Sequence, residues 1–176
     1  MPFQVTSNRA FVKQLLVHNY RLLNIPLNMS IADGLYQIFC AADNVPIGRA
    51  LAEDLSLLPK RVITLPPDAA PTRPWIVIKN PNDTFTIKVA DAPTAEIDGK
   101  LFGVLLDSPP PTEWKLTPIE RNGPDAYIVT TSDLVKGWVV PDVEPQNQID
   151  VRPLIVGLSE PPFYPPTEVF IFKRLE

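Results

Sequence analysis

The length, composition and charge of the chain limit the class of protein it can be. Its 176 residues suit one domain, and 22 prolines against 7 glycines favour many short elements joined by rigid turns over long helices. With 16 basic and 20 acidic residues the chain is mildly acidic, so we expect neither nucleic acid nor a membrane as a partner.

Residues 1–28 differ in composition from the rest of the chain. They contain no acidic residue, and apolar side chains such as Phe11 and Leu15 recur at helical spacing. Lys13 interrupts the apolar run too soon for a transmembrane span or a secretory signal, so we expect an N-terminal extension with a short helix. Without a secretory signal, and with Cys40 unable to form an internal disulfide, the expected location is the cytoplasm.

Residues 29–176 predict a single all-β domain. Short runs rich in β-branched and aromatic residues alternate with clusters of Pro, Asp, Asn and Gly, a pattern typical of barrels and sandwiches. Three runs open with Asp and then alternate aromatic and aliphatic residues at period two, and each is the expected first strand of a repeat. These runs are residues 33–39, 83–89 and 125–131.

Each repeat is expected to contain three more strands. The last strand of each is bulky, at residues 75–80, 113–119 and 168–175, with Trp75, Trp114 and Phe170 at similar places and expected in the core. The second strands are expected around residues 47–51, 94–97 and 137–141, and the third strands run into prolines at 62–67, 104–111 and 154–162. Twelve strands in three pseudo-repeats predict a β-trefoil, in which six strands form a barrel and six a hairpin cap.

The residue types in the chain do not suggest catalysis. His18 is the one histidine, so a Ser-His-Asp triad would depend on it alone, and no Cys/His cluster has the spacing of a zinc site. We therefore expect neither an enzyme nor a metal site. Trefoil lectins share a Gln-x-Trp motif, but the positions two before the tryptophans are Arg73, Thr112 and Lys136. A lectin-like, carbohydrate-binding module remains an alternative.

A series of runs in this order resembles the mushroom β-trefoil serine protease inhibitors. They are "MSIADGLYQI", "PTAEIDGKLFGVLLD", "EWKLTPI", "DAYIVTT", "GW", "VRPLIVGLSEPPFYPP" and "FIFKRL", which extend from Met29 nearly to the end of the chain. The resemblance implies a trefoil scaffold without disulfides or cofactors that presents loops to trypsin-like or chymotrypsin-like serine proteases, and we expect a monomer. Fungal cysteine protease inhibitors share this scaffold and are a second alternative.

The stretch "GLSEPPFYPP" is the expected protease-binding loop. Proline fixes φ and biases the preceding residue towards extended backbone, so four prolines in ten residues predict a loop held in one shape before binding. Such preorganisation lowers the ordering cost of association. A lid over the open end of the barrel is the other interpretation of this stretch. The residues expected to contact the protease are Gly157, Leu158, Ser159, Glu160, Pro161 and Pro162.

The residue that enters the S1 pocket sets the target protease. A trypsin-like enzyme needs Lys or Arg there, and the stretch from Gly157 to Thr167 contains neither. Leu158 is therefore the predicted specificity residue, which suits an apolar S1 pocket of the chymotrypsin type. Lys136 and Arg121, in other loops, are the alternative specificity residues for a trypsin-like target.

Overall fold

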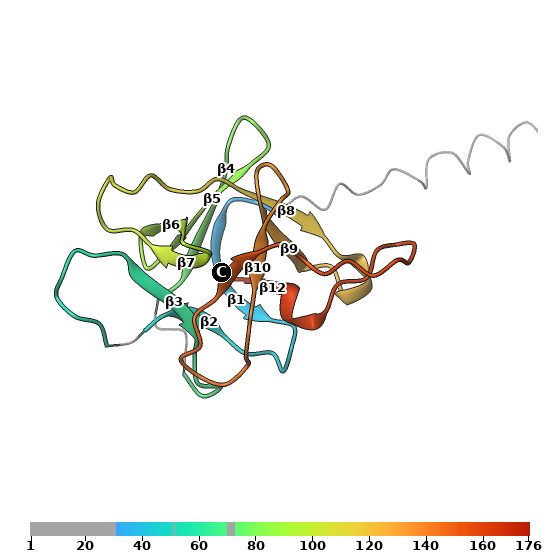
Figure 1. The fold of residues 1–176 in the computed structure, drawn as a ribbon, viewed down its shortest axis with the longest axis horizontal. Coiled ribbons are helices and arrows are strands. Elements are labelled where there is room, and N and C mark those ends of the chain that lie inside the picture. The colour runs from blue at the N-terminus through green and yellow to red at the C-terminus, as the bar shows by residue number, and fades with distance from the viewer. Residues whose placement is uncertain (1–30, 51, 70–72) are drawn as a thin grey trace, which may run out of the picture.

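The computed structural model describes residues 31–50, 52–69 and 73–176, so the helix predicted within residues 1–28 lies outside the described residues. In the described part of the chain there are twelve β-strands, two short 3-10 helices and no α-helix (Figure 1), which confirms the all-β prediction. No helix there is long and apolar enough to span a membrane. The elements are β1 (Gly34–Cys40), β2 (Ile47–Arg49), β3 (Lys60–Thr64), β4 (Trp75–Lys79), β5 (Phe85–Val89), β6 (Ala92–Ile97), β7 (Lys100–Gly103), β8 (Trp114–Pro118), η1 (Glu120–Asn122), β9 (Ala126–Thr131), β10 (Gly137–Val139), β11 (Asp150–Arg152), η2 (Pro166–Glu168) and β12 (Phe170–Arg174).

Six of these strands close into a barrel. Each pairs antiparallel with two others, in the order β1, β4, β5, β8, β9, β12 and back to β1. The pairing of β1 with β12 runs from Tyr36 opposite Arg174 to Cys40 opposite Phe170. Because the ring is closed, these six strands leave no long unpaired edge that could pair with another chain.

The other six strands form three hairpins, β2–β3, β6–β7 and β10–β11. The hairpins also contact one another, since β3 pairs with β7, β7 pairs with β11, and Ile63 of β3 forms a bridge with Gln148 just before β11. Each hairpin therefore meets the other two. Two barrel strands and one hairpin recur three times along the chain, in agreement with the repeat seen in the sequence.

The predicted third strands of the second and third repeats are wrong. Residues 104–111 contain no strand, and residues 154–162 contain only one isolated bridge; the strands lie earlier, as β7 and β11. Asp98 and Gly99 have positive φ values of 50° and 74°, so they form a tight turn that starts β7 directly after β6. The prolines that follow cannot donate to a ladder, and both segments are loops.

Aromatic side chains fill the centre of the barrel. The predicted burial of Trp75 and Trp114 is confirmed, with 2% and 0% of their surfaces exposed, and Phe170 is buried too. These three residues begin β4, β8 and β12, the equivalent strands of the three repeats. Trp138 of β10 lies against all three, with ring-centroid distances of 5.7, 5.3 and 5.7 Å to Trp75, Trp114 and Phe170.

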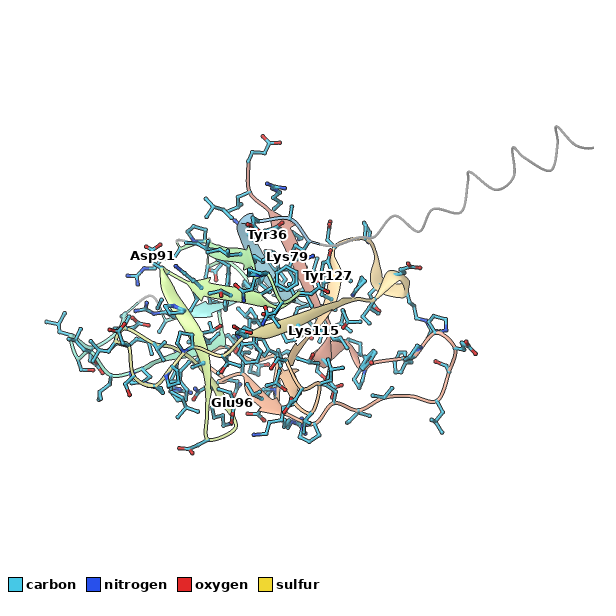
Figure 2. The ribbon with its side chains drawn as sticks, turned by 90° about the horizontal axis from the view of Figure 1, so that it is seen from above. Tyr36, Lys79, Asp91, Glu96, Lys115 and Tyr127 are labelled. Carbon is cyan, nitrogen blue, oxygen red and sulfur yellow. The ribbon has the colours of Figure 1, made fainter. Side chains whose placement is uncertain are left out.

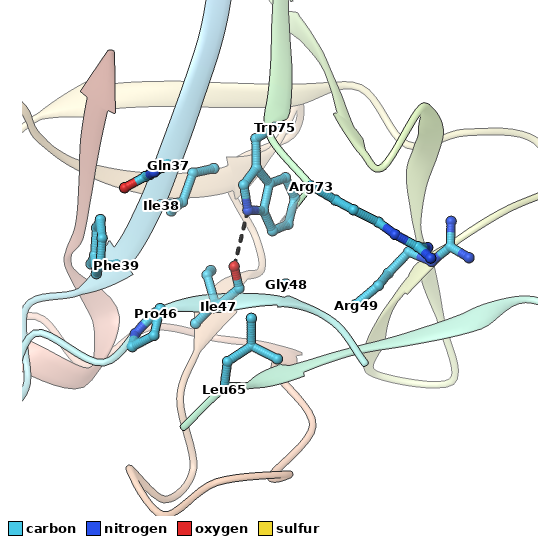
Figure 3. Close-up of a pocket in the computed structure, with 10 residues that line it drawn as sticks. All are labelled: Gln37, Ile38, Phe39, Pro46, Ile47, Gly48, Arg49, Leu65, Arg73 and Trp75. Carbon is cyan, nitrogen blue, oxygen red and sulfur yellow. Dashed lines mark hydrogen bonds between the residues drawn. The ribbon is translucent and has the colours of Figure 1, made fainter. Parts of the chain in front are cut away.

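The buried tryptophans also connect the barrel to the hairpins. Trp75 Nε1 donates to the Ile47 carbonyl of β2 at 3.0 Å (Figure 3), and Trp114 Nε1 donates to Thr94 Oγ1 of β6 at 2.8 Å. A buried indole N–H is stabilised by a partner, so these bonds hold the β2–β3 and β6–β7 hairpins in position on the barrel.

A second aromatic group surrounds Phe172 of β12. Its ring contacts Tyr36 and Tyr127 edge-on, with centroids 6.1 and 5.5 Å away. Both tyrosines are labelled in Figure 2. These ring contacts hold strands β1, β9 and β12 together on the inner side of the barrel.

Candidate functional site

The Pro-rich stretch connects β11 to β12 as an exposed loop. In Figure 1 it extends away from the barrel beside η1. Leu158 is fully exposed, at 106% of its reference surface, and Phe163 is 45% exposed. The loop therefore presents apolar side chains to solvent, where they gain nothing for folding and are available to a partner.

The tip of this loop is closed on itself. The Gly157 N–H donates to the Phe163 carbonyl at 2.7 Å, and Ser159 Oγ donates to the Pro161 carbonyl at 2.7 Å. The Ser159 N–H also donates to the Gly157 carbonyl at 2.9 Å, which makes a three-residue turn centred on Leu158. The prolines alone predict an extended tip, but the tip is a turn. Hydrogen bonds as well as prolines hold its shape.

The loop has a first arm, residues 153–156, and a second arm, residues 164–165, on either side of the tip. Both arms contact a small apolar cluster at the barrel surface. Leu154 comes from the first arm and Tyr164 from the second, and both are partly buried. The Leu154 methyl groups would lie 2.9 Å from a Cβ on Gly137, so the glycine that begins β10 makes room for this side chain. The buried members of the cluster are Ile119, Ala126, Ile128 and Val169.

A buried carboxylate lies under the first arm. Glu168 of η2 is only 1% exposed, and its Oε1 and Oε2 accept from the Ile155 N–H at 3.1 and 2.9 Å. Burial raises the pKa of Glu168, while the hydrogen bond from Ile155 and the charge of Arg152 oppose that rise. Glu168 thus joins the two ends of the loop across its base.

Arg121, one of the alternative specificity residues, lies beside the Pro-rich loop. It is exposed in η1, and its guanidinium carbon is 5.9 Å from the centre of the Phe163 ring. The sequence presented Arg121 and the loop as competing candidates, but the structure joins them in one surface. A groove between them is lined by Thr117, Pro118, Ile119, Glu120, Arg121, Pro161, Pro162 and Tyr164.

Lys136, the other alternative, is turned towards β6. Its Nζ lies 3.4 Å from Oε1 of Glu96, which is labelled in Figure 2, and its side chain is partly buried. Its backbone N–H and carbonyl both bond to Thr131 across the β9–β10 turn. A partly exposed ion pair at this distance contributes about 0–1 kcal/mol, so the pair holds Lys136 only weakly.

A second exposed loop, between β2 and β3, was not predicted as a site. Figure 1 places it on the opposite side of the barrel from the Pro-rich loop, and Leu55 in it is fully exposed at 101%. The Asp54 carboxylate pairs with Lys60 and accepts from the Ser56 N–H at 2.9 Å. These bonds, that with Lys60 above all, lower the pKa of Asp54 to about 2. The leucine-rich run "DLSLLP" is the sequence signal for this exposed loop.

The described part of the chain also contains side chains of the metal-binding types and a free cysteine. In the ranges that the structure describes, no three His, Cys, Asp or Glu side chains are placed to hold a metal ion. Cys40, at the end of β1, is buried, and burial raises the pKa of its thiol to about 11. The thiol therefore stays protonated and unreactive near neutral pH.

Comparison with known proteins identifies the family of this chain. The sequence pattern of the peptidase inhibitor I66 family matches residues 29–174. A serine protease inhibitor from Lentinula edodes is 42% identical over 130 residues, which are 74% of this chain and 89% of that protein.

Solved structures agree in fold with this chain. A proteinase inhibitor from Coprinopsis cinerea has a TM-score of 0.78 and 39% identity, and the match covers 83% of this chain and all (100%) of that one. The ricin B-like lectin of Macrolepiota procera, solved with lactose, has a TM-score of 0.61 over 83% of this chain and 99% of its own, but at 13% identity the likeness extends to the fold alone. Since the family pattern spans most of the sequence, and a 42% identical relative supports it, the chain belongs to the peptidase inhibitor I66 family.

Proposed function

We propose that this protein inhibits serine proteases by placing the loop of residues 157–162 in the protease active site, with Leu158 in the S1 pocket. The observation that carries the proposal is a fully exposed Leu158 on a loop closed by its own hydrogen bonds. As a member of a peptidase inhibitor family, the protein is a protease inhibitor and not an enzyme.

The shape of the loop favours tight binding. A flexible loop loses conformational freedom on association, and each ordered side chain costs about 0.5–1.5 kcal/mol. Here the Gly157–Phe163 and Ser159–Pro161 hydrogen bonds already hold the tip in the free protein. Most of the ordering cost is thus met when the chain folds rather than when it binds.

The surroundings of the loop supply additional contact area. A protease–inhibitor complex buries about 1,600 Å² in total, more than one loop tip provides. Phe163 and Arg121 flank the tip on one side, and the groove that Arg121 lines together with Pro161 and Pro162 continues the same surface. We therefore assign Arg121 to the rim of the contact surface rather than to the S1 pocket.

The target class follows from the side chain at the tip. An apolar S1 pocket accepts leucine, whereas a trypsin-like pocket needs a cation. The Arg121 guanidinium lies beside the Phe163 ring, and Lys136 is paired with Glu96. A chymotrypsin-like enzyme is the expected partner, bound by one inhibitor monomer.

We also infer that the scaffold is a β-trefoil of residues 29–176, preceded by an extension of residues 1–28. The closed six-stranded barrel and the three mutually paired hairpins support this fold. The similarity in fold to a ricin B-like lectin points the same way, but sugar binding is not favoured here. The rings of Trp75 and Trp114 are buried. The pocket beside Trp75, shown in Figure 3, is lined mostly by apolar side chains such as Ile47 and Leu65.

A panel of proteases tests the proposal. The full chain is titrated against chymotrypsin, subtilisin, trypsin and papain, and Ki is measured with a chromogenic substrate for each. We expect the serine proteases with apolar S1 pockets to be inhibited most strongly. Inhibition of papain alone would instead identify a cysteine protease inhibitor, and retention on a lactose resin without any inhibition would identify a lectin.

A further inference from the structure

We propose that Glu168 is the positioning residue of the inhibitory loop. Its carboxylate holds the Ile155 N–H and so keeps the arm that leads to Leu158 in its binding shape. The effect on inhibition rests on the proposed function of the loop, whereas the clamp itself is a property of the free protein.

Glu168 is buried although its side chain is ionisable. A carboxylate seldom lies fully buried without a cationic partner, because its desolvation is costly unless hydrogen bonds replace the lost water. Glu168 is 1% exposed, and no salt bridge joins it to another side chain in the described part of the chain. Glu168 instead binds the main chain of the loop, because both of its carboxylate oxygens accept from the Ile155 N–H.

The support of Glu168 is rigid. The Pro166 carbonyl of η2 accepts from the Ala42 N–H at 3.1 Å, and the Thr167 carbonyl accepts from the Val140 N–H at 2.9 Å. Helix η2 is therefore fixed to the segments that follow β1 and β10. Through Glu168, that rigidity reaches the backbone of the loop.

The arm that Glu168 holds has little packing of its own. Ile155 and Val156 are more than half exposed, and Leu158 is fully exposed, so side-chain burial does not keep these residues in place. The first arm is held by partly buried Leu154 at one end and by the Gly157 hydrogen bond at the other. Between these two points the Glu168–Ile155 contact fixes the backbone.

Loss of the clamp should convert the loop from an inhibitor towards a substrate. If one residue of backbone becomes free, ordering it again on binding weakens inhibition by about tenfold. A mobile loop also lets the protease hydrolyse the Leu158–Ser159 bond and release the cut chain. An inhibitor and a substrate can present the same loop sequence to a protease. The inhibitor is the one whose loop the protease hydrolyses slowly.

Two substitutions separate positioning from stability. Glu168→Leu is close in size to the native side chain but removes the acceptor. It also removes the cost of burying a charged group, and the N–H of Ile155, a residue that is 60% exposed, can bond to water instead, so we expect stability to be unchanged or higher. Glu168→Gln keeps one acceptor oxygen and should restore most of the clamp. Val77→Ala, in the barrel core, serves as the matched control, because it lowers stability without contact to the loop.

Four measurements are made on the full chain and its variants. These are the melting temperature, the Ki against chymotrypsin, the rate at which excess chymotrypsin cuts the loop, and amide exchange of residues 154–158. For Glu168→Leu we expect an unchanged or higher melting temperature, faster exchange at Ile155, faster cutting and a Ki about tenfold higher. Glu168→Gln should lie close to the native protein, and Val77→Ala should melt earlier with an unaltered Ki.

The native protein alone also tests the clamp. The Ile155 N–H should exchange as slowly as amides of the barrel strands, and rapid exchange there would overturn the proposal even if Glu168→Leu failed to fold. Unchanged exchange and Ki in a folded Glu168→Leu would overturn it as well. If Leu158→Ala leaves inhibition intact, the loop assignment is wrong, and the exchange of Ile155 still decides whether the clamp exists.

Discussion

Truncation of Leu158 tests the assigned loop most directly. Leu158 is fully exposed in the free protein, so burial of its side chain takes place only on binding. Leu158→Ala removes the equivalent of three methylene groups from the S1 contact, at about 0.8 kcal/mol each. The expected loss is about 2.4 kcal/mol, or roughly fiftyfold in Ki.

The same exposure predicts that folding is unaffected. An exposed side chain that contacts no buried group changes the free energy of unfolding by no more than about 0.5 kcal/mol. Leu55→Ala is the matched control, because Leu55 is an equally exposed leucine in the loop between β2 and β3. Ki is measured from progress curves of chymotrypsin with a chromogenic peptide at several inhibitor concentrations, and thermal unfolding is recorded for each variant.

The two leucine variants give opposite outcomes for the two loops. If the reasoning holds, Leu158→Ala weakens inhibition and Leu55→Ala behaves as the native protein. If Leu55→Ala loses inhibition while Leu158→Ala retains it, the loop between β2 and β3 is reactive, and the Pro-rich loop is a cover for the barrel.

Three further predictions concern specificity, packing and pH. Leu158→Lys should shift inhibition from chymotrypsin to trypsin, while Lys136→Ala and Arg121→Ala leave the preference unchanged; a native trypsin inhibition that either alanine variant abolishes would reassign the S1 residue. Gly137→Ala would place a Cβ 2.8 Å from a backbone oxygen of β9, so urea denaturation should show a loss of about 1–3 kcal/mol, and an unchanged midpoint would contradict this packing. Burial raises the pKa of Cys40 from 9.0 to about 11 and so favours the thiol in the folded state. Its contribution to stability is complete below about pH 9 and is lost as the pH rises through 11, which urea titrations at several pH values measure against Cys40→Ala.

The sequence alone determined the all-β class and the position of most strands. Period-two alternation is a local property, and a large aromatic residue repeated at one position of each unit has to be buried somewhere. Trp75, Trp114 and Phe170 accordingly begin three equivalent strands and meet in the core. The Pro-rich composition of residues 157–166 likewise identified an exposed, shaped loop before any contact was known.

The sequence pattern predicted the wrong strand positions in places where the structure depends on which strands pair with each other. Apolar runs at 104–111 and 154–162 look like strands, but the hairpin turns upstream place β7 and β11 before them. A strand exists only where a neighbour offers its hydrogen bonds, and the register of that neighbour is set across the fold rather than along the chain.

The contacts that shape the loop were decided only by the tertiary structure. Glu168 lies 13 residues after Ile155 and looks like an ordinary surface charge in the sequence, yet it is buried under the loop. Arg121 comes from a different connection and lies beside Phe163. Sequence reveals which residues are stiff, apolar or charged, whereas the group that each one contacts follows from closure of the barrel, which brings β8, β9 and β12 together.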